Sequence, residues 1–319
     1  MSEYHVPVML DESVTALITN PQGTYADCTF GGGGHTAEIL SRLQDGGRVI
    51  AFDRDSDALA NAPDDPRLTL VHNNFRFIEN YAELLRREEP GKRVFPGAPE
   101  VFDGILADLG VSSHQFDTAE RGFSFRYDAP LDMRMGRESE TTAADIVNTR
   151  SQEDLERILR LYGEVDGARN IARLIVAARA EEPIRTTGDL DRAIEKALPK
   201  TAAHKQLAKI YQALRIEVNQ EMRALEKFLD GAARSLKEGG RLVVITYHSL
   251  EDRMVKNFIR TGNVEGKEEK DMYGRVHAPL AAVLRKPLTP GEEEIAGNTR
   301  ARSAKLRVAE KSMERRTGA

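Results

Sequence analysis

Short apolar runs alternate with helix-type segments over the first third of this chain. Four runs are almost entirely apolar, and each is followed by polar or glycine-rich residues. They are Tyr25–Cys28, Val49–Phe52, Leu68–His72 and Phe102–Ala107. Runs of this kind are typical of parallel strands that are buried on both faces. Helix patterns lie between them at Ser56–Ala62 and Phe77–Arg87, and the Pro- and Gly-rich segment Glu89–Pro99 predicts a loop.

Helical spacing replaces this pattern between about residues 140 and 230. Ser151 and the acidic residues after it are typical of a helix start, and Thr187 opens a similar segment. Two sets of apolar residues then recur at helical spacing. They are Leu155, Ile158, Leu159 and Tyr162, and Ile171, Leu174, Ile175 and Ala178. We therefore predict an all-helical insertion within an α/β domain.

The insertion is predicted over residues 126–212, and residues 1–125 and 213–319 are predicted to build the discontinuous α/β domain. Strand character returns at Arg241–Tyr247. Two further strands are predicted at Ala282–Arg285 and Ala304–Val308, where they can pair as a hairpin that closes the sheet.

Composition places the chain among soluble globular proteins. Of its 319 residues, 40% are hydrophobic and 30% charged, and no run reaches the roughly 18 apolar residues of a membrane span. The first residues lack the features of a signal peptide. Cys28 is the only cysteine, so no intrachain disulfide can form, and the histidines show no metal-ligand spacing. We expect a cytoplasmic protein without a metal site.

The net charge of −5 is unevenly distributed. Residues 169–215 and 241–319 each carry an excess of Lys and Arg. A polyanion could dock on such stretches. Composition alone is equally consistent with solvated helix faces.

A glycine run follows the first predicted strand and is the strongest functional signal. Four consecutive glycines, Gly31–Gly34, lead into a helix pattern, and the next strand ends on Asp53, 22 positions after Gly31. Glycine lets a backbone approach a ligand closely, and a helix N-terminus offers free N–H donors. An acidic residue at the end of the second strand can accept hydrogen bonds from both ribose hydroxyls. Strand, glycine turn, helix, strand and acid together predict a pocket for an adenosine-type cofactor.

Two cofactors fit this pattern. A dinucleotide is one, but the spacing G-x-G-x-x-G is not met, because Thr36 stands at the sixth position counted from Gly31. S-adenosylmethionine is the other, and its sulfonium cation suits a pocket rich in carboxylates. Asp27, Asp53 and Asp108 all fall at or beside predicted strand ends. The acids therefore favour S-adenosylmethionine.

Four other side chains are candidates for the site. Asp108 ends the fourth strand and so faces the ligand crevice of an open α/β sheet, although it can also be a turn residue. Gln115 could contact adenine, and Phe75 could stack on it or simply pack in the core. His248 follows the fifth strand, where it could orient a substrate, relay a proton or be structural.

Taken together, these motifs resemble the RsmH (MraW) family, and they run through nearly the whole chain in order. The matching stretches are His5–Glu12, Asp27–His35, Asp53–Asp55, Asp108–Ser113, Glu120–Phe125, Pro130–Met135, His248–Arg253 and Asn298–Ser303. The family consists of bacterial S-adenosylmethionine-dependent methyltransferases that modify N4 of a cytidine in the decoding region of 16S rRNA.

The resemblance implies an α/β class I methyltransferase fold, Rossmann-like with a mostly parallel sheet, and an inserted all-helical domain. It implies S-adenosyl-L-methionine as the cofactor and 16S rRNA of the small ribosomal subunit as the partner. By similarity, the cofactor site comprises Gly33, Gly34, His35, Asp53, Phe75, Asp108 and Gln115.

For catalysis, Asp108 is the first hypothesis for the group that accepts a proton from the target amine, and His248 is the second. The helical insertion and the basic C-terminal part are predicted to hold RNA phosphates. The sequence is compatible with a homodimer but does not require one. Two other functions remain: an NAD-dependent Rossmann dehydrogenase, and a non-catalytic RNA-binding assembly factor built on a methyltransferase fold.

Overall fold

The computed structural model describes residues 7–60, 62–88, 101–136, 139–274 and 276–312. The chain forms two compact units: Met1–Gly110 together with Arg223–Ala319, and Val111–Met222. The second unit contains the whole predicted insertion, 126–212, and is longer at both ends. The predicted loop Glu89–Pro99 lies outside the described residues.

The first unit is built on one seven-stranded sheet, in the order β3-β2-β1-β4-β5-β7-β6. The strands are β1 Thr24–Asp27, β2 Arg48–Asp53, β3 Leu68–His72, β4 Phe102–Asp108, β5 Leu236–Thr246, β6 Leu280–Ala282 and β7 Lys305–Lys311. β1 to β5 are parallel, whereas β7 is antiparallel to both β5 and β6. The order along the sheet reverses at β1, between β2 and β4. Ligands of open α/β sheets bind at such a switch point, beyond the carboxyl ends of the strands.

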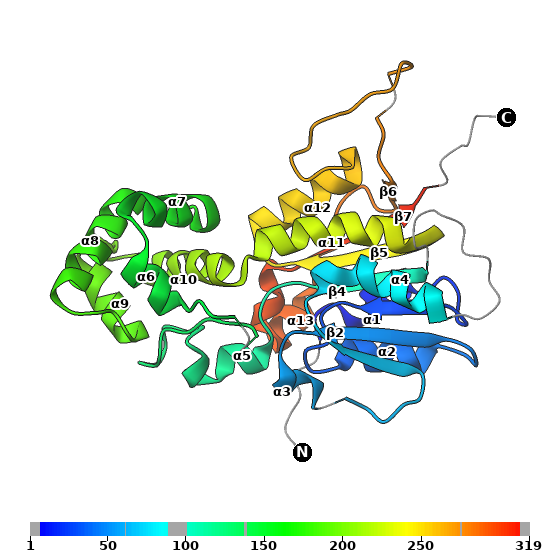
Figure 1. Ribbon diagram of the computed structural model, residues 1–319, viewed down its shortest axis with the longest axis horizontal. Coiled ribbons are helices and arrows are strands. Elements are labelled where there is room, and N and C mark those ends of the chain that lie inside the picture. Colours follow the sequence, from blue (N-terminus) through cyan, green and yellow to red (C-terminus); the bar gives the residue numbers. More distant parts are fainter. Residues whose placement is uncertain (1–6, 61, 89–100, 137–138, 275, 313–319) are drawn as a thin grey trace. The chain divides into compact units, whose positions relative to one another are not determined.

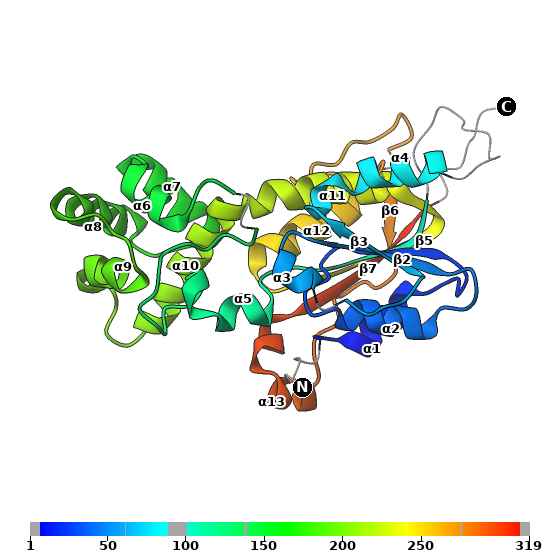
Figure 2. The same ribbon diagram turned by 60° about the horizontal axis from the view of Figure 1, so that its bottom comes forward.

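Helices cover both faces of this sheet (Figures 1 and 2). The helices of the first unit are α1 Leu10–Leu17, α2 Gly34–Arg42, α3 Ser56–Leu59, α4 Ile78–Glu88, α11 Glu221–Ser235 (from Arg223 on), α12 Ser249–Thr261 and α13 Glu292–Gly297. One core joins one face of the sheet to α4, α11 and α12, and a second joins the other face to α1 and α2. Neighbouring residues of β4 alternate between them: Ile105 lies in the first core and Leu106 in the second. The two-sided burial predicted for this strand is confirmed.

Three predictions about elements in this unit are wrong in part. β3 is an edge strand in which only Val71 is buried, because it is the last strand of the sheet in the described part of the chain and pairs on one side with β2. The predicted helix Ser56–Ala62 ends at Leu59. The predicted strand Ala282–Arg285 lies a few residues too far toward the C-terminus, since β6 covers Leu280–Ala282. Its antiparallel pairing with β7 is confirmed.

The second unit is helical, as its pattern predicts. Its α-helices are α5 Ser113–Asp117, α6 Ala143–Thr149, α7 Gln152–Gly163, α8 Ala168–Glu181, α9 Thr187–Ile194 and α10 Ala203–Asn219. Ser151 caps α7 by accepting from the Asp154 backbone N–H at 3.1 Å, so the predicted helix start is confirmed. The apolar faces of these helices form one separate core.

No helix in the described ranges is both long enough and apolar enough to span a lipid bilayer.

Candidate active site

The glycine loop of residues 29–34 follows β1 and is held by the two strands on either side of β1. The backbone N–H of Phe30 donates to the carbonyl of Phe52 in β2, at 2.9 Å. On the other side, the backbone N–H of Asp108 in β4 donates to Thr29 Oγ1 at 2.7 Å. The loop therefore lies at the switch point of the sheet, where the sequence pattern predicts a cofactor pocket.

The glycines of this loop do not all serve the same purpose. Gly33 has φ +78°, and a Cβ there would lie 2.8 Å from the ring of Phe30. A Cβ on Gly34 would lie 2.2 Å from Cγ of Pro7. Both glycines are thus required by the protein's own packing, whether or not a ligand approaches them. Gly31 has φ +52°, and a Cβ there would have only the Thr29 carbonyl oxygen within 4 Å, so this glycine leaves the loop surface open.

Asp53 is joined directly to the glycine loop. Its Oδ2 accepts from the Gly31 backbone N–H at 2.7 Å, and its Oδ1 accepts from the Asp55 backbone N–H at 2.9 Å. Burial raises the pKa of this carboxyl group, although these N–H donors favour the ionised form. A carboxylate has about four acceptor positions, so both oxygens can accept further bonds. This capacity fits the two hydroxyls of a ribose.

Asp108 lies at the carboxyl end of β4, with its side chain between two elements. The Tyr247 hydroxyl donates to Asp108 Oδ1 at 2.7 Å, and His35 Nδ1 is 4.0 Å from Oδ2. Burial raises the pKa of Asp108 to about 6, because His35 and Tyr247 offset only part of the cost of burying the charge. An acid with such a pKa is mostly ionised at neutral pH and is still a better base than an ordinary aspartate.

His35 is the second residue of α2, which begins at Gly34. Its side chain is buried, and Nε2 lies 3.3 Å from the carbonyl oxygen of Val8. The structure therefore brings Gly33, Gly34, His35, Asp53 and Asp108 together at one edge of the sheet. Their roles toward a cofactor stay predictions.

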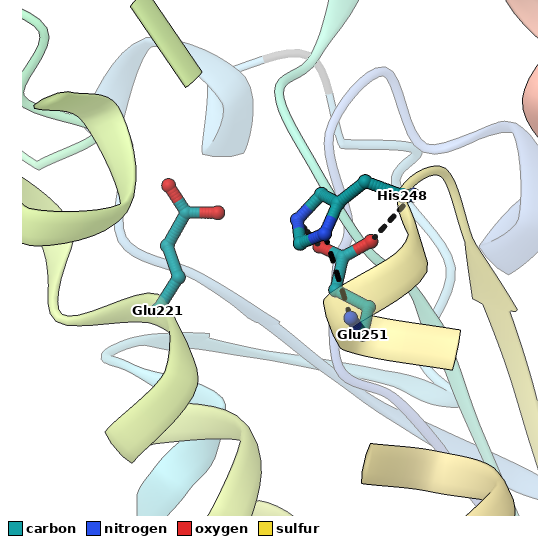
Figure 3. Close-up of side chains that lie close together, drawn as sticks. All are labelled: Glu221, His248 and Glu251. Atoms are coloured by element: carbon teal, nitrogen blue, oxygen red, sulfur yellow. Dashed lines mark hydrogen bonds and ion pairs between the residues drawn. The ribbon is translucent and has the colours of Figure 1, made fainter. Parts of the chain in front are cut away.

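His248 is the N-cap of α12, and Figure 3 shows its imidazole beside Glu251. Nδ1 accepts from the Glu251 backbone N–H at 3.4 Å, and Nε2 is 3.1 Å from Glu251 Oε1. The third side chain drawn there, Glu221, belongs to the second unit and pairs with Arg215 at 2.8 Å. Helix capping is a structural role for His248, and a catalytic one stays the second hypothesis.

The two predicted adenine contacts lie in different units. Phe75, in a 3₁₀ helix after β3, packs edge-on against Phe228 of α11, with ring centroids 5.2 Å apart. Gln115 belongs to the second unit, where its amide completes a capping box with Ser112 and donates to the carbonyl of Met135 at 3.3 Å. Contacts of either residue with adenine stay predictions.

Sequence reasoning gave no role to Tyr247 and did not foresee the structural role of Asp27. Tyr247 follows β5 directly, and the rule that placed Asp108 in the crevice applies to it as well. Asp27 is fully buried, and its two oxygens accept from Thr36 Oγ1 at 2.7 Å and from the Thr29 backbone N–H at 3.1 Å. It links Thr29 at the start of the glycine loop to Thr36 in α2, and it adds negative charge to the site.

The family model of the MraW methylase family matches residues 2–312. The chain belongs to the MraW methylase family. A relative from Bacteroides fragilis named ribosomal RNA small subunit methyltransferase H is 54% identical over 308 residues, which are 97% of each chain. A relative of the same name from Flavobacterium johnsoniae is 52% identical over 309 residues, 97% of this chain and 98% of that one.

Family membership confirms the predicted class I methyltransferase fold and S-adenosyl-L-methionine as the cofactor. The solved structure of TrmN from Thermus thermophilus is similar at 13% identity, with a TM-score of 0.41, over 95% of this chain and 48% of that one. A similarity at this level adds nothing to the family assignment.

Proposed function

We propose that this protein transfers a methyl group from S-adenosylmethionine to N4 of a cytidine in the decoding region of 16S rRNA. The MraW methylase family supplies the reaction class, and the names of the relatives supply the small-subunit rRNA. The observation that carries the chemistry is the partly buried carboxyl group of Asp108 beside the glycine loop. Its raised pKa supports a role as the proton acceptor that methyl transfer to an amine needs.

The residues at the sheet edge suit the cofactor. Asp53 would accept hydrogen bonds from the ribose hydroxyls, and the open surface at Gly31 would allow close approach of the ligand. S-adenosylmethionine supplies, when bound, a methyl group on a positively charged sulfur. Two acids at the same edge, the buried Asp27 and the partly buried Asp108, make the site favourable for a cation.

The target amine needs a proton acceptor. The lone pair of the cytosine N4 is delocalised into the ring, so the amine is a weak nucleophile. A carboxylate that accepts an N–H hydrogen bond localises that lone pair. Bound S-adenosylmethionine would give up the methyl group by cleavage of its S–C bond and leave as neutral S-adenosylhomocysteine. As the new N–C bond forms, one N–H bond breaks and its proton passes to the Asp108 carboxylate, which keeps the charges balanced. The base must be unpaired or flipped for this geometry to form.

Asp53 provides a direct test of the cofactor site. We expect Asp53→Asn to lower the affinity for S-adenosylhomocysteine by roughly 10- to 100-fold, because a charged acceptor of two hydrogen bonds is lost. Titration calorimetry measures the affinity. Asp45→Asn is the matched control, since Asp45 is exposed in the turn before β2, at the other end of the same strand. Equal affinities for the two variants would show that Asp53 does not bind the cofactor.

Exposed lysines of the second unit are proposed to contact RNA phosphates. Lys196 and Lys200 lie between α9 and α10, Lys205 lies in the first turn of α10, and all three are exposed. Replacing all three with alanine is expected to weaken rRNA binding and to make the plot of log K against log salt less steep by roughly 2 to 3. Filter binding over a range of salt concentrations measures this slope. Lys227→Ala, an exposed lysine of α11, is the control and should leave it unchanged.

The two other functions are separated by simple assays. A dehydrogenase would bind NAD, whereas we expect binding of S-adenosylhomocysteine and none of NAD. A non-catalytic assembly factor would bind small-subunit rRNA without modifying it. We expect transfer of labelled methyl to small-subunit rRNA and none to large-subunit rRNA. Label on both, or on neither, would refute the proposed substrate.

A further inference from the structure

Tyr247 reaches the candidate proton acceptor from a neighbouring strand. Asp108 pairs with Ile245 in the parallel register of β4 and β5, and Tyr247 comes two residues later. Its hydroxyl donates to Asp108 Oδ1 at 2.7 Å, the usual distance for a well-formed O–H···O hydrogen bond. The other oxygen, Oδ2, faces His35 Nδ1 at the longer distance of 4.0 Å. One oxygen is thus held, while the other keeps room for a donor.

Tyr247 is itself held in place from two directions. Its backbone N–H donates to Glu251 Oε2 at 3.0 Å, within the capping box of α12. Its ring lies against Gly110, where a Cβ would be 3.4 Å from Cδ2 of the tyrosine. The backbone N–H of Leu109, next to Asp108, donates to the carbonyl of Ile245 at 3.0 Å. The hydroxyl and the carboxyl group therefore belong to segments tied to each other.

Burial has the largest effect on the protonation of the pair, and the surrounding charges modify it. His35 and Tyr247 favour the ionised form of Asp108, whereas the negative charges of Asp27 and Glu251 oppose it. Burial and the neighbouring Asp108 charge raise the pKa of Tyr247, and Glu251 and Glu294 act in the same direction. Tyr247 therefore stays a neutral donor throughout the physiological range, and its hydrogen bond is made to the carboxylate.

We infer that Tyr247 is a positioning residue for methyl transfer: its hydroxyl orients the Asp108 carboxylate so that Oδ2 is presented to the target amine. The inference rests on the proposed function, in which Asp108 accepts the amine proton. Loss of the hydroxyl removes a donor to a buried charge, so the carboxylate becomes harder to ionise. Asp108 would then remain protonated, and unable to accept a proton, over a wider range of pH.

The experiment compares Tyr247→Phe with the wild type in two measurements. In ligand-free protein, carbon-13 NMR titration of the aspartate carboxyls, assigned with Asp108→Asn, should show the Asp108 midpoint raised by roughly one to two pH units. In single-turnover assays with rRNA, the acid limb of the pH–rate profile should shift to higher pH by the same amount. Activity lost near neutral pH should return at alkaline pH, with the KM for rRNA unchanged.

Tyr25→Phe is the matched control. Tyr25 lies in β1 of the same sheet, and its hydroxyl donates to the carbonyl of Asn20 at 2.9 Å. The Tyr25→Phe variant should give the wild-type Asp108 midpoint and the wild-type pH–rate profile. A Tyr247→Phe loss of activity that is independent of pH, or an unmoved Asp108 midpoint, overturns the inference. Failure of the wild type to methylate rRNA overturns the proposed function instead, and the NMR titration still tests the hydrogen bond.

Discussion

Replacing Asp108 with asparagine is expected to slow methyl transfer strongly and to make the folded protein more stable at pH 8. The rate should fall by roughly 10²- to 10⁴-fold, the usual contribution of a positioned proton acceptor. The stability gain follows from burial of the charge. The pKa of Asp108 is raised to about 6 in the folded protein, whereas an unfolded chain releases this proton near pH 4.

The sign of this effect follows from the direction of the shift. The folded state binds the Asp108 proton more tightly, so the contribution favours folding below pH 4 and is lost as pH rises through about 6. At pH 8 the ionised carboxylate therefore costs up to about 3 kcal/mol, which a neutral asparagine avoids. Urea unfolding at pH 8 and at pH 4 measures this difference. The gain should be present at pH 8 and absent at pH 4.

Asp103 provides a control of opposite sign at the other end of β4. Burial alone would raise its pKa, but Lys237 Nζ at 2.7 Å and the Thr24 backbone N–H at 2.8 Å lower it below the ordinary value. Its ionised form thus stabilises the fold above pH 4, and Asp103→Asn should make the protein less stable without changing methyl transfer. If Asp108→Asn also destabilised the protein at pH 8, burial of a functional charge would not explain the site.

Gly122→Ala is expected to destabilise the second unit by about 3 kcal/mol or more. Gly122 ends a 3₁₀ helix (Ala119–Arg121) with φ +68°. A Cβ there would lie 2.2 Å from the carbonyl oxygen of Pro130 and 2.9 Å from the Asp132 backbone nitrogen. Since both are backbone atoms, no side-chain rotation relieves the contact. Hydrogen exchange in peptides from α6 to α10, followed by mass spectrometry, measures the loss of protection.

Gly167→Ala separates the clash from the backbone strain. Gly167 lies in the same unit with φ +69°, but nothing lies within 4 Å of a Cβ at this position. Only the left-handed conformation is then penalised, at about 1 kcal/mol. Similar exchange in the two variants would contradict the close approach of Gly122 to the Pro130 segment.

The sequence predicts the sheet well where strands are buried on both sides. β1, β2 and β4 are short apolar runs that end on Asp27, Asp53 and Asp108, and the structure places all three ends at one edge. β3 has a similar composition but lies at the edge of the sheet, mostly exposed. Periodicity cannot distinguish these cases, because exposure depends on which strand happens to be the last in the sheet.

The site is predicted less completely, since some of its residues are engaged by the protein itself. The sequence pattern predicts Gly34 to be a ligand contact. A glycine is needed there in any case, because a Cβ would clash with Pro7, which is distant in sequence. Gln115 reads as an adenine contact, yet Ser112 and Gln115 have the S-x-x-Q spacing of a capping box, a signal that the sequence did contain. The hydrogen bond of Tyr247 to Asp108 depends on strand register, which no local pattern reveals.

Mapping of the methylated nucleotide tests the central claim most directly. Small ribosomal subunits that lack the modification are incubated with the protein and isotopically labelled S-adenosylmethionine, and the rRNA is then digested and sequenced by mass spectrometry. We predict one labelled methyl group on N4 of a cytidine in the decoding region, and far less label with Asp108→Asn. A label on a ring carbon, on a ribose or on another nucleotide would contradict the account, as would full labelling by the Asp108 variant.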